Sequence, residues 1–287
     1  MQKITGLFSP ILIISLFIST LTACSGEKPD YIDRMSAEHK DDSPVANASA
    51  DAEITEPVVT ETVAYANVDG QKITGYLAKP EGTDSNLPGI IVIHEWWGLN
   101  DNIRMMTRRL ASLGYKALAV DLYRGKVAET PENAGKYARE VGENNENAVD
   151  NLRQAYAYLD SEEEVTKTGV LGWCFGGAWS LNTALAIPDK IDASVIYYGR
   201  LVTDPDRLEK LDMPILGLFG AEDRGIPVEN VREFESVLND LGKDATIHIY
   251  EDAGHAFANP SGTRYNEEAA EKAWTETTEF LNEHLGN

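Results

Sequence analysis

Hydrophobic residues along the chain fall into short runs that are separated by longer segments of mixed polarity. Residues 60–66 and 71–78 alternate between apolar and polar positions, and the Asp69-Gly70 pair between them is typical of a tight hairpin turn. Later apolar runs occupy residues 89–94, 117–120, 169–173, 193–197, 215–219 and 247–250. Because these runs are apolar at every position rather than at every second one, they predict strands buried on both faces of a parallel sheet.

Segments with helical spacing lie between the runs, at residues 101–113, 132–159, 177–186, 228–241 and 266–285. A hairpin followed by alternating strands and helices predicts one α/β domain over residues 58–287, with about eight mostly parallel strands flanked by helices. Ligands of such sheets bind beyond the carboxyl ends of the strands. The residues that follow the strands are therefore the candidates for a functional site.

The first residues of the chain do not follow this pattern of strands and helices. Lys3 and the mostly apolar residues 7–21 have the features of a secretory signal peptide, and this run is shorter than the roughly 20 residues of a membrane span. It ends in LTACSG, which resembles the lipobox of bacterial lipoproteins. The resemblance implies a signal peptide over residues 1–23, lipidation of Cys24 and, because Ser25 follows, an outer-membrane location facing the periplasm. The alternatives are an uncleaved anchor and an ordinary signal peptide.

Residues 24–57 are rich in Ser, Ala, Asp and Glu and show neither helical nor strand periodicity. A segment with so few apolar residues cannot bury enough surface to offset the entropy lost on ordering. We expect it to be a flexible tether between the lipid and the domain.

Charge and cysteine content limit the possible partners. The 287 residues include 47 acidic and 25 basic side chains, a formal net charge of −22, which repels nucleic acid and anionic lipid headgroups. Membrane contact is therefore expected only through the lipid anchor. Cys24 and Cys174 lie in different contexts, and the five scattered histidines form no metal-binding motif. We expect a monomer without a disulfide, metal or organic cofactor.

The clearest chemical signal is the sequence GWCFGG at residues 172–177, which ends a predicted strand and opens a predicted helix. This is the nucleophile-elbow pattern with cysteine in place of serine. Gly172 and Gly176 let the flanking chains approach closely, and the helix N-terminus favours the thiolate form of Cys174. The alternative is a buried and inert cysteine. The strand-turn-helix context favours the nucleophile.

A nucleophilic thiol requires a base, and the base requires an orienting acid. In proteins with this elbow, the three follow in the order nucleophile, acid, histidine. Asp223 and His255 each stand just past a predicted strand end, in that order, with Glu222 as the rival acid. The backbone N–H groups of Phe175 and Trp96 are the candidate donors of an oxyanion hole.

Together these motifs resemble the dienelactone hydrolase family, which has the α/β-hydrolase fold, over about residues 60–285. The matching stretches are HEWWGLN at 94–100, DLY at 121–123, GWCFGG at 172–177, YYG at 197–199 and GHAF at 254–257. The resemblance implies hydrolysis of a lactone or ester through a thiol ester, with Cys174, Asp223 and His255 as the catalytic triad. It also implies that Glu95 is a carboxylate that supports the thiol in the resting enzyme.

Substrate recognition is less specific. In the dienelactone enzymes an arginine shortly after the catalytic histidine helps to hold the substrate carboxylate, whereas Asn259 stands in that region here. We therefore do not assign the dienelactone itself as substrate. Trp97, Arg124 and Tyr198 follow strand ends and are the candidate substrate contacts; a solvated loop arginine is the alternative for Arg124.

The sequence thus predicts a hydrolase that acts on a small-molecule ester or lactone. A broad carboxylesterase, a thioesterase or a peptidase would use the same triad and differ in pocket shape. A lipoprotein that binds a ligand without turnover is the alternative from another class, and the complete triad argues against it. A thiol redox role lacks a second cysteine near Cys174 in the sequence.

Overall fold

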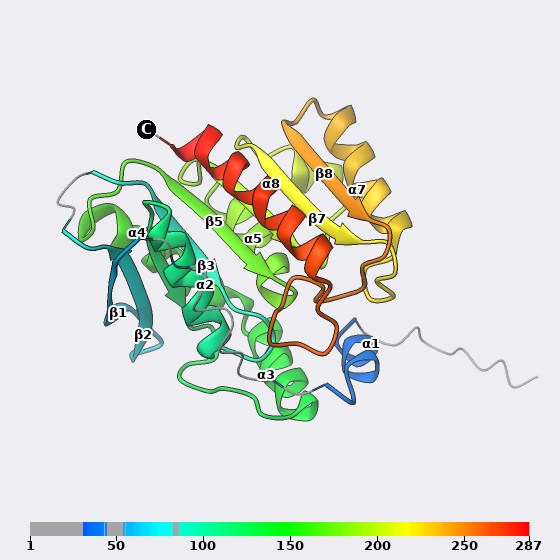
Figure 1. Cartoon of the computed structure of the whole chain (residues 1–287), viewed down its shortest axis with the longest axis horizontal. Coiled ribbons are helices and arrows are strands. Elements are labelled where there is room, and N and C mark those ends of the chain that lie inside the picture. The colour runs from blue at the N-terminus through cyan, green and yellow to red at the C-terminus, as the bar shows by residue number, and fades with distance from the viewer. Residues whose placement is uncertain (1–30, 43, 45–53, 55, 83–85, 287) are drawn as a thin grey trace, which may run out of the picture.

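The structure, a computed structural model, describes residues 31–42, 44, 54, 56–82 and 86–286 (Figure 1). The predicted signal peptide at residues 1–23 and the predicted lipidation site Cys24 lie outside these residues. In the described part of the chain, no helix combines the length and apolar character that a membrane span requires.

Eight strands form one sheet in the order β1-β2-β4-β3-β5-β6-β7-β8. The strands are β1 (Val58–Val68), β2 (Gln71–Pro80), β3 (Gly89–Ile93), β4 (Lys116–Val120), β5 (Thr168–Trp173), β6 (Ala193–Tyr197), β7 (Ile215–Gly220) and β8 (Ala245–Tyr250). The hairpin of β1 and β2 joins β4 in an antiparallel manner, and all later neighbours pair in parallel. The predicted mostly parallel sheet of about eight strands is confirmed.

The hairpin turn is made by Asp69 and Gly70, whose φ angles are 56° and 74°. Both residues are in the left-handed region, as a tight two-residue hairpin turn requires. In the centre of the sheet, the side chains from Ile90 to Ile93 are fully buried and point alternately to the two faces. This burial on both sides explains why the run is apolar at every position.

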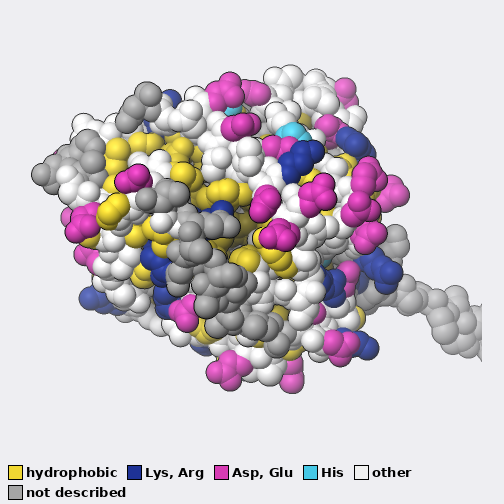
Figure 2. Space-filling model, in the orientation of Figure 1, with side chains coloured by type: hydrophobic (Ala, Val, Ile, Leu, Met, Phe, Trp, Pro, Cys, Tyr) yellow, Lys and Arg dark blue, Asp and Glu magenta, His cyan; other side chains and the backbone are white. Residues whose placement is uncertain are grey.

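Helices cover both faces of the sheet (Figure 1). α2 (Asp101–Ser112) and α8 (Glu267–Leu285) pack on one face, and α4 (Asn145–Ser161), α5 (Phe175–Ala186) and α7 (Val228–Asp240) pack on the other. Two further helices, α3 (Pro131–Glu143) and the short α6 (Pro205–Leu208), lie in the connections. Acidic side chains are scattered over the face of the molecule that Figure 2 shows, consistent with the strongly negative net charge.

The single helix predicted over residues 132–159 is wrong. Asn144 interrupts it with φ −110° and ψ 44°, so that α3 ends and α4 begins there. The side-chain amide of Asn144 donates a hydrogen bond to the carbonyl of Glu140 (2.7 Å) and satisfies the end of α3. The helical period continues across the break, which is why the pattern of apolar residues does not reveal it.

Residues 31–38 form a further helix, α1 (Tyr31–Glu38), inside the segment in which the sequence pattern predicts no regular structure. Met35 on this helix is only 3% exposed. α1 lies beside α3 and beyond the carboxyl ends of the strands (Figure 1). Contacts with the domain stabilise this helix, and such contacts leave no periodic signal in a short polar segment.

Candidate active site

Cys174 stands at the turn between β5 and α5 with φ 55°, in the left-handed region that non-glycine residues rarely adopt. The two glycines that flank it are required by close backbone packing. A Cβ atom on Gly176 would lie 2.2 Å from the carbonyl oxygen of Ile93, and one on Gly172 would lie 2.2 Å from that of Gly176. The sequence motif therefore forms a tight strand-to-helix turn with the thiol at its tip.

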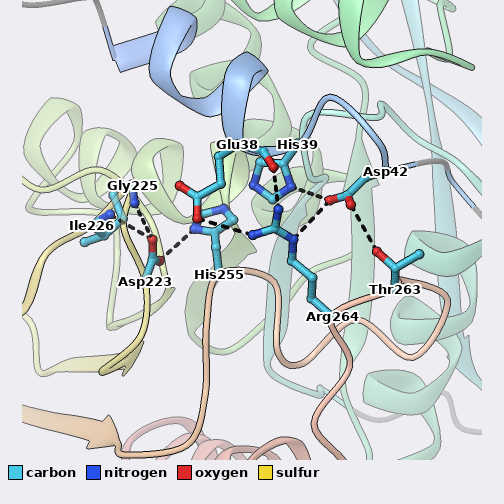
Figure 3. A network of polar contacts seen from close by, with 9 residues as sticks. All are labelled: Glu38, His39, Asp42, Asp223, Gly225, Ile226, His255, Thr263 and Arg264. Carbon is cyan, nitrogen blue, oxygen red and sulfur yellow. Dashed lines mark hydrogen bonds and ion pairs between the residues drawn. The ribbon is translucent and has the colours of Figure 1, made fainter.

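The structure joins His255 to Asp223, from the loops after β8 and β7. The Nδ1 atom of His255 lies 2.7 Å from Oδ2 of Asp223, and both side chains are completely buried. The other carboxylate oxygen accepts the backbone N–H groups of Gly225 (2.8 Å) and Ile226 (2.9 Å) (Figure 3). Glu222, the rival acid, is exposed.

The pKa values of His255 and Asp223 shift in opposite directions. Burial alone would lower the pKa of His255, but the charges of Asp223 and Cys174 raise it well above the ordinary value. Burial would likewise raise the pKa of Asp223, but His255 and the two backbone donors lower it. Since Nδ1 of His255 faces Asp223, its Nε2 atom is left for the cavity that Cys174 also lines, and Nε2 has no hydrogen-bond partner among the described residues.

The two predicted oxyanion donors come from elements next to the cavity of Cys174. Phe175 is the first residue of α5, and Trp96 follows β3 on the loop that lines the same cavity. Within the described part of the chain, neither backbone N–H group finds an acceptor. These two N–H groups remain the candidate oxyanion donors. The side chain of Trp96 packs against that of Trp97, with 5.1 Å between the ring centroids.

Glu95 lines the cavity as well, and Asn259 holds it in place. The Asn259 amide donates to Oε2 of Glu95 (2.5 Å), while its oxygen accepts the N–H and hydroxyl groups of Ser261. Burial raises the pKa of Glu95 to about 7, although His255 and Asn259 oppose the shift. The residue that marks the departure from the dienelactone enzymes thus binds the predicted thiol-supporting carboxylate.

The three predicted substrate contacts lie in different places. Trp97 lines the cavity with Cys174. Tyr198 is fully buried and packs on the His255 ring at 5.2 Å between centroids. Arg124 is directed to Gln71 (3.5 Å) and lines a separate cavity of about 400 Å³. Only Trp97 of these three borders the space beside the thiol.

His39 borders the same space, although the sequence offers no sign of it. Its ring centroid lies 5.0 Å from that of His255 and 5.2 Å from that of Trp96. Arg264, on the loop after β8, also lines the cavity. The place of His39 depends on where residues 31–42 pack, which no motif in the sequence encodes. The described residues contain no cluster of three or more His, Cys, Asp or Glu side chains suited to a metal ion.

Comparison with known proteins shows the family of the chain. The sequence profile of the dienelactone hydrolase family matches residues 73–285. The protein usf of Aquifex pyrophilus is 35% identical over 224 residues, which cover 76% of this chain and 96% of that protein. A Saccharolobus solfataricus protein named "Putative carboxymethylenebutenolidase" is 33% identical over 258 residues, covering 77% of this chain and 98% of that protein.

Solved structures show the same architecture. The crystal structure of a "Putative Dienelactone Hydrolase" from Klebsiella pneumoniae subsp. pneumoniae MGH 78578 has a TM-score of 0.70 and 26% sequence identity, covering 79% of this chain and 99% of that one. The fold is the α/β-hydrolase fold, as the sequence predicts. Residues 31–42 lie before the stretch that the family profile matches.

Proposed function

Because the chain belongs to the dienelactone hydrolase family, we propose that it hydrolyses an ester or lactone through a thiol ester formed on Cys174. One observation carries this proposal. Cys174 stands in a left-handed turn at the start of α5 and shares a cavity with the imidazole of the buried His255–Asp223 pair. This observation supports Cys174 as the nucleophile, His255 as the base and Asp223 as the orienting acid of acyl transfer.

In the first half of the reaction, His255 holds the proton of the Cys174 thiol and the thiolate attacks the carbonyl carbon. The negative charge that forms on the carbonyl oxygen is bound by the backbone N–H groups of Phe175 and Trp96. When the tetrahedral intermediate collapses, the carbon–oxygen bond of the ester breaks. The leaving alkoxide takes the proton from His255, and a thiol ester remains.

In the second half, His255 accepts a proton from a water molecule that attacks the thiol ester. The same two N–H groups bind the oxyanion, the carbon–sulfur bond breaks and the carboxylic acid leaves. Asp223 keeps Nε2 of His255 directed at the cavity throughout, because its carboxylate fixes the Nδ1–H tautomer. These steps balance with water as the only co-reactant.

Glu95 gives the site a second ionisable group near neutrality. With a pKa of about 7, this carboxyl group exchanges its proton with small changes in its surroundings. We propose that it supports the resting thiol and that Asn259 positions it. In this proposal the carboxyl group of Glu95 gives up or takes a proton as the charge on Cys174 changes during the cycle.

The substrate class is drawn from the relatives. The names dienelactone hydrolase and carboxymethylenebutenolidase describe enzymes that open a lactone, and we propose a lactone or a small ester for this chain. A carboxylesterase, a thioesterase and a peptidase would use the same residues. Hydrolysis rates measured on a panel of lactones, aryl esters, thioesters and peptide amides distinguish these activities.

The decisive experiment removes the nucleophile. Cys174→Ala should lower kcat/KM by several orders of magnitude, since only binding and the oxyanion donors remain. His255→Ala should give a similar loss, and the double variant should be no worse, because the two residues act as a unit. Cys24→Ser, which changes the other cysteine, is the matched control and should retain activity. Near wild-type turnover by Cys174→Ala would instead favour a ligand-binding protein.

A further inference from the structure

Residues 31–42, here called the gate, lie across the carboxyl ends of the strands, beside the loop after β8 (Figure 1). Tyr31, Met35 and His39 follow one another at intervals of four residues and share one face of the helical turn. The N–H of His39 donates to the Met35 carbonyl (2.9 Å), so this turn continues past the end of α1. The face that carries the three side chains is turned toward the catalytic residues.

Met35 and Tyr31 lie close to the residues of the proposed triad. A Cβ atom added to Gly225 would lie only 2.4 Å from the sulfur of Met35. Met35 therefore packs on the loop whose N–H groups bind Asp223. The hydroxyl of Tyr31 is buried and has no hydrogen-bond partner among the described residues. Burial, with the charges of Cys174 and Asp223 nearby, raises its pKa. The gate therefore contacts the machinery directly.

His39 of the gate lines the cavity beside Cys174. Its Nδ1 atom bonds to Oδ2 of Asp42 (2.5 Å), the residue is 3% exposed, and its Nε2 atom has no partner in the described part of the chain. This ring stands 5.0 Å from the ring of His255, centroid to centroid. A histidine–carboxylate pair from the gate thus faces the histidine–carboxylate pair of the triad.

Arg264 holds the gate from the loop after β8, which also carries His255 (Figure 3). Its guanidinium donates to the backbone carbonyl of Glu38 (2.5 Å) and lies 3.3 Å from carboxylate oxygens of both Glu38 and Asp42. The Thr263 hydroxyl donates to Asp42 (3.0 Å). The Arg264 side chain is still 28% exposed, so water can compete for these contacts. These partly exposed polar contacts can break and form again as the gate moves.

With the gate in place, the space beside Cys174 amounts to about 20 Å³. That volume holds one water molecule, whereas sites for small organic ligands measure roughly 300–1,000 Å³. His39 and Asp42 of the gate are among the residues that line it. The space beside the thiol is therefore too small for an ester, and two residues of the gate help to bound it.

We propose that the gate is an intramolecular plug of the active site, and that substrate reaches Cys174 only after residues 31–42 move away from Arg264 and the triad loops. The gate precedes residues 73–285, the stretch matched by the family profile. The proposal rests on the proposed function only for the identity of the substrate. Access to the thiol can be measured without any hydrolysis.

The test measures alkylation of Cys174 in the full chain by iodoacetamide and by the bulkier N-ethylmaleimide, with peptide mass spectrometry to separate Cys174 from Cys24. Arg264→Gln removes the charged contacts of the gate, and Met35→Ala removes its apolar contact by an independent route. Each should accelerate both reagents by the same factor, on the order of tenfold, because both reagents wait for the same opening. Arg232→Gln, which breaks an exposed pair with Glu235 on α7, is the matched control and should change neither rate.

The outcomes separate cleanly. Unchanged alkylation in both variants would overturn the gate, as would a preference for the smaller reagent that neither variant alters, which indicates a fixed narrow cavity. Faster alkylation in both variants supports the gate, whether or not any ester is cleaved. If alkylation accelerates but no substrate of the panel is hydrolysed, the gate stands and the proposed function fails. Thermal unfolding of each variant verifies that the domain is folded.

Discussion

Replacement of Asp223 by asparagine tests the orienting acid of the proposed triad. The side chain has two distinct oxygens, one that accepts two backbone N–H groups and one that accepts His255. Asparagine keeps the shape of aspartate and removes its charge. The two N–H donors require the amide oxygen on their side, so the amide nitrogen of Asp223→Asn must face Nδ1 of His255.

That orientation reverses the proton pattern of the imidazole. An amide N–H facing Nδ1 requires a lone pair there, which moves the ring proton to Nε2, the atom directed at the cavity with Cys174. His255 can then no longer accept the thiol proton. The corresponding change in serine proteases lowers kcat about 10⁴-fold, and we expect a loss of roughly 10³- to 10⁴-fold here, equal to about 4–5.5 kcal/mol of transition-state stabilisation.

The assay is kcat/KM for an aryl ester, measured between pH 5 and 9 together with the thermal unfolding temperature. The fold should survive, because both backbone N–H groups keep an acceptor. Glu222→Gln, one residue earlier and exposed, is the control for loss of a negative charge in this loop and should retain activity. A folded Asp223→Asn enzyme that loses less than about tenfold would show that His255 does not depend on this carboxylate, and the triad assignment would be wrong.

Three further predictions concern packing, ionisation and processing. Gly176→Ala should destabilise the fold by more than about 3 kcal/mol in chemical denaturation, because its Cβ would meet the carbonyl of Ile93, whereas Gly142→Ala in the open part of α3 should be neutral or stabilising by up to about 1 kcal/mol. The carboxyl of Glu95 has a raised pKa of about 7 against 4.5 unfolded, so its contribution to stability is complete below pH 4.5 and is lost as pH rises through 7. The unfolding free energy of the wild type, relative to Glu95→Gln, should therefore fall by about 3 kcal/mol over that interval, and a flat difference would contradict the burial of a neutral acid. Cys24→Ala should abolish incorporation of labelled fatty acid in bacterial cells, and a wild-type chain that never takes up the label would contradict lipid anchoring.

The elements that sequence reasoning predicted well are those whose residues carry their own physical requirement. A strand such as β3 is buried on both faces and must be apolar throughout, and the left-handed turn at Asp69 and Gly70 favours those residue types. Cys174, Asp223 and His255 each follow a strand, and the carboxyl ends of these parallel strands meet at one edge of the sheet. The bond between Asp223 and His255 therefore agrees with the sequence prediction, and its catalytic role remains the proposal.

The features that escaped prediction depend on contacts between distant segments. His39 lies in a polar stretch and joins the site only because α1 packs against loops more than 180 residues later in the chain, at Gly225 and Arg264. Asn259 holds Glu95 across 164 residues of sequence. A local break such as Asn144 is missed for another reason, since helical periodicity persists on both sides of it. None of these has a signature within a short window.

Because the gate and the site it covers belong to one polypeptide, the gate behaves as a tethered inhibitor with its own local concentration. Residues 43–57 join it to β1, and a short connection of this kind gives an effective concentration on the order of millimolar. Burial of a methionine such as Met35 contributes about 1.5–3 kcal/mol, and partly exposed ion pairs such as those of Arg264 contribute at most about 1 kcal/mol each. While the closed form predominates, a loss of about 1.4 kcal/mol from these contacts raises the fraction of open molecules about tenfold. Lengthening the connection would dilute the inhibitor and raise the basal rate without altering a single residue of the catalytic site.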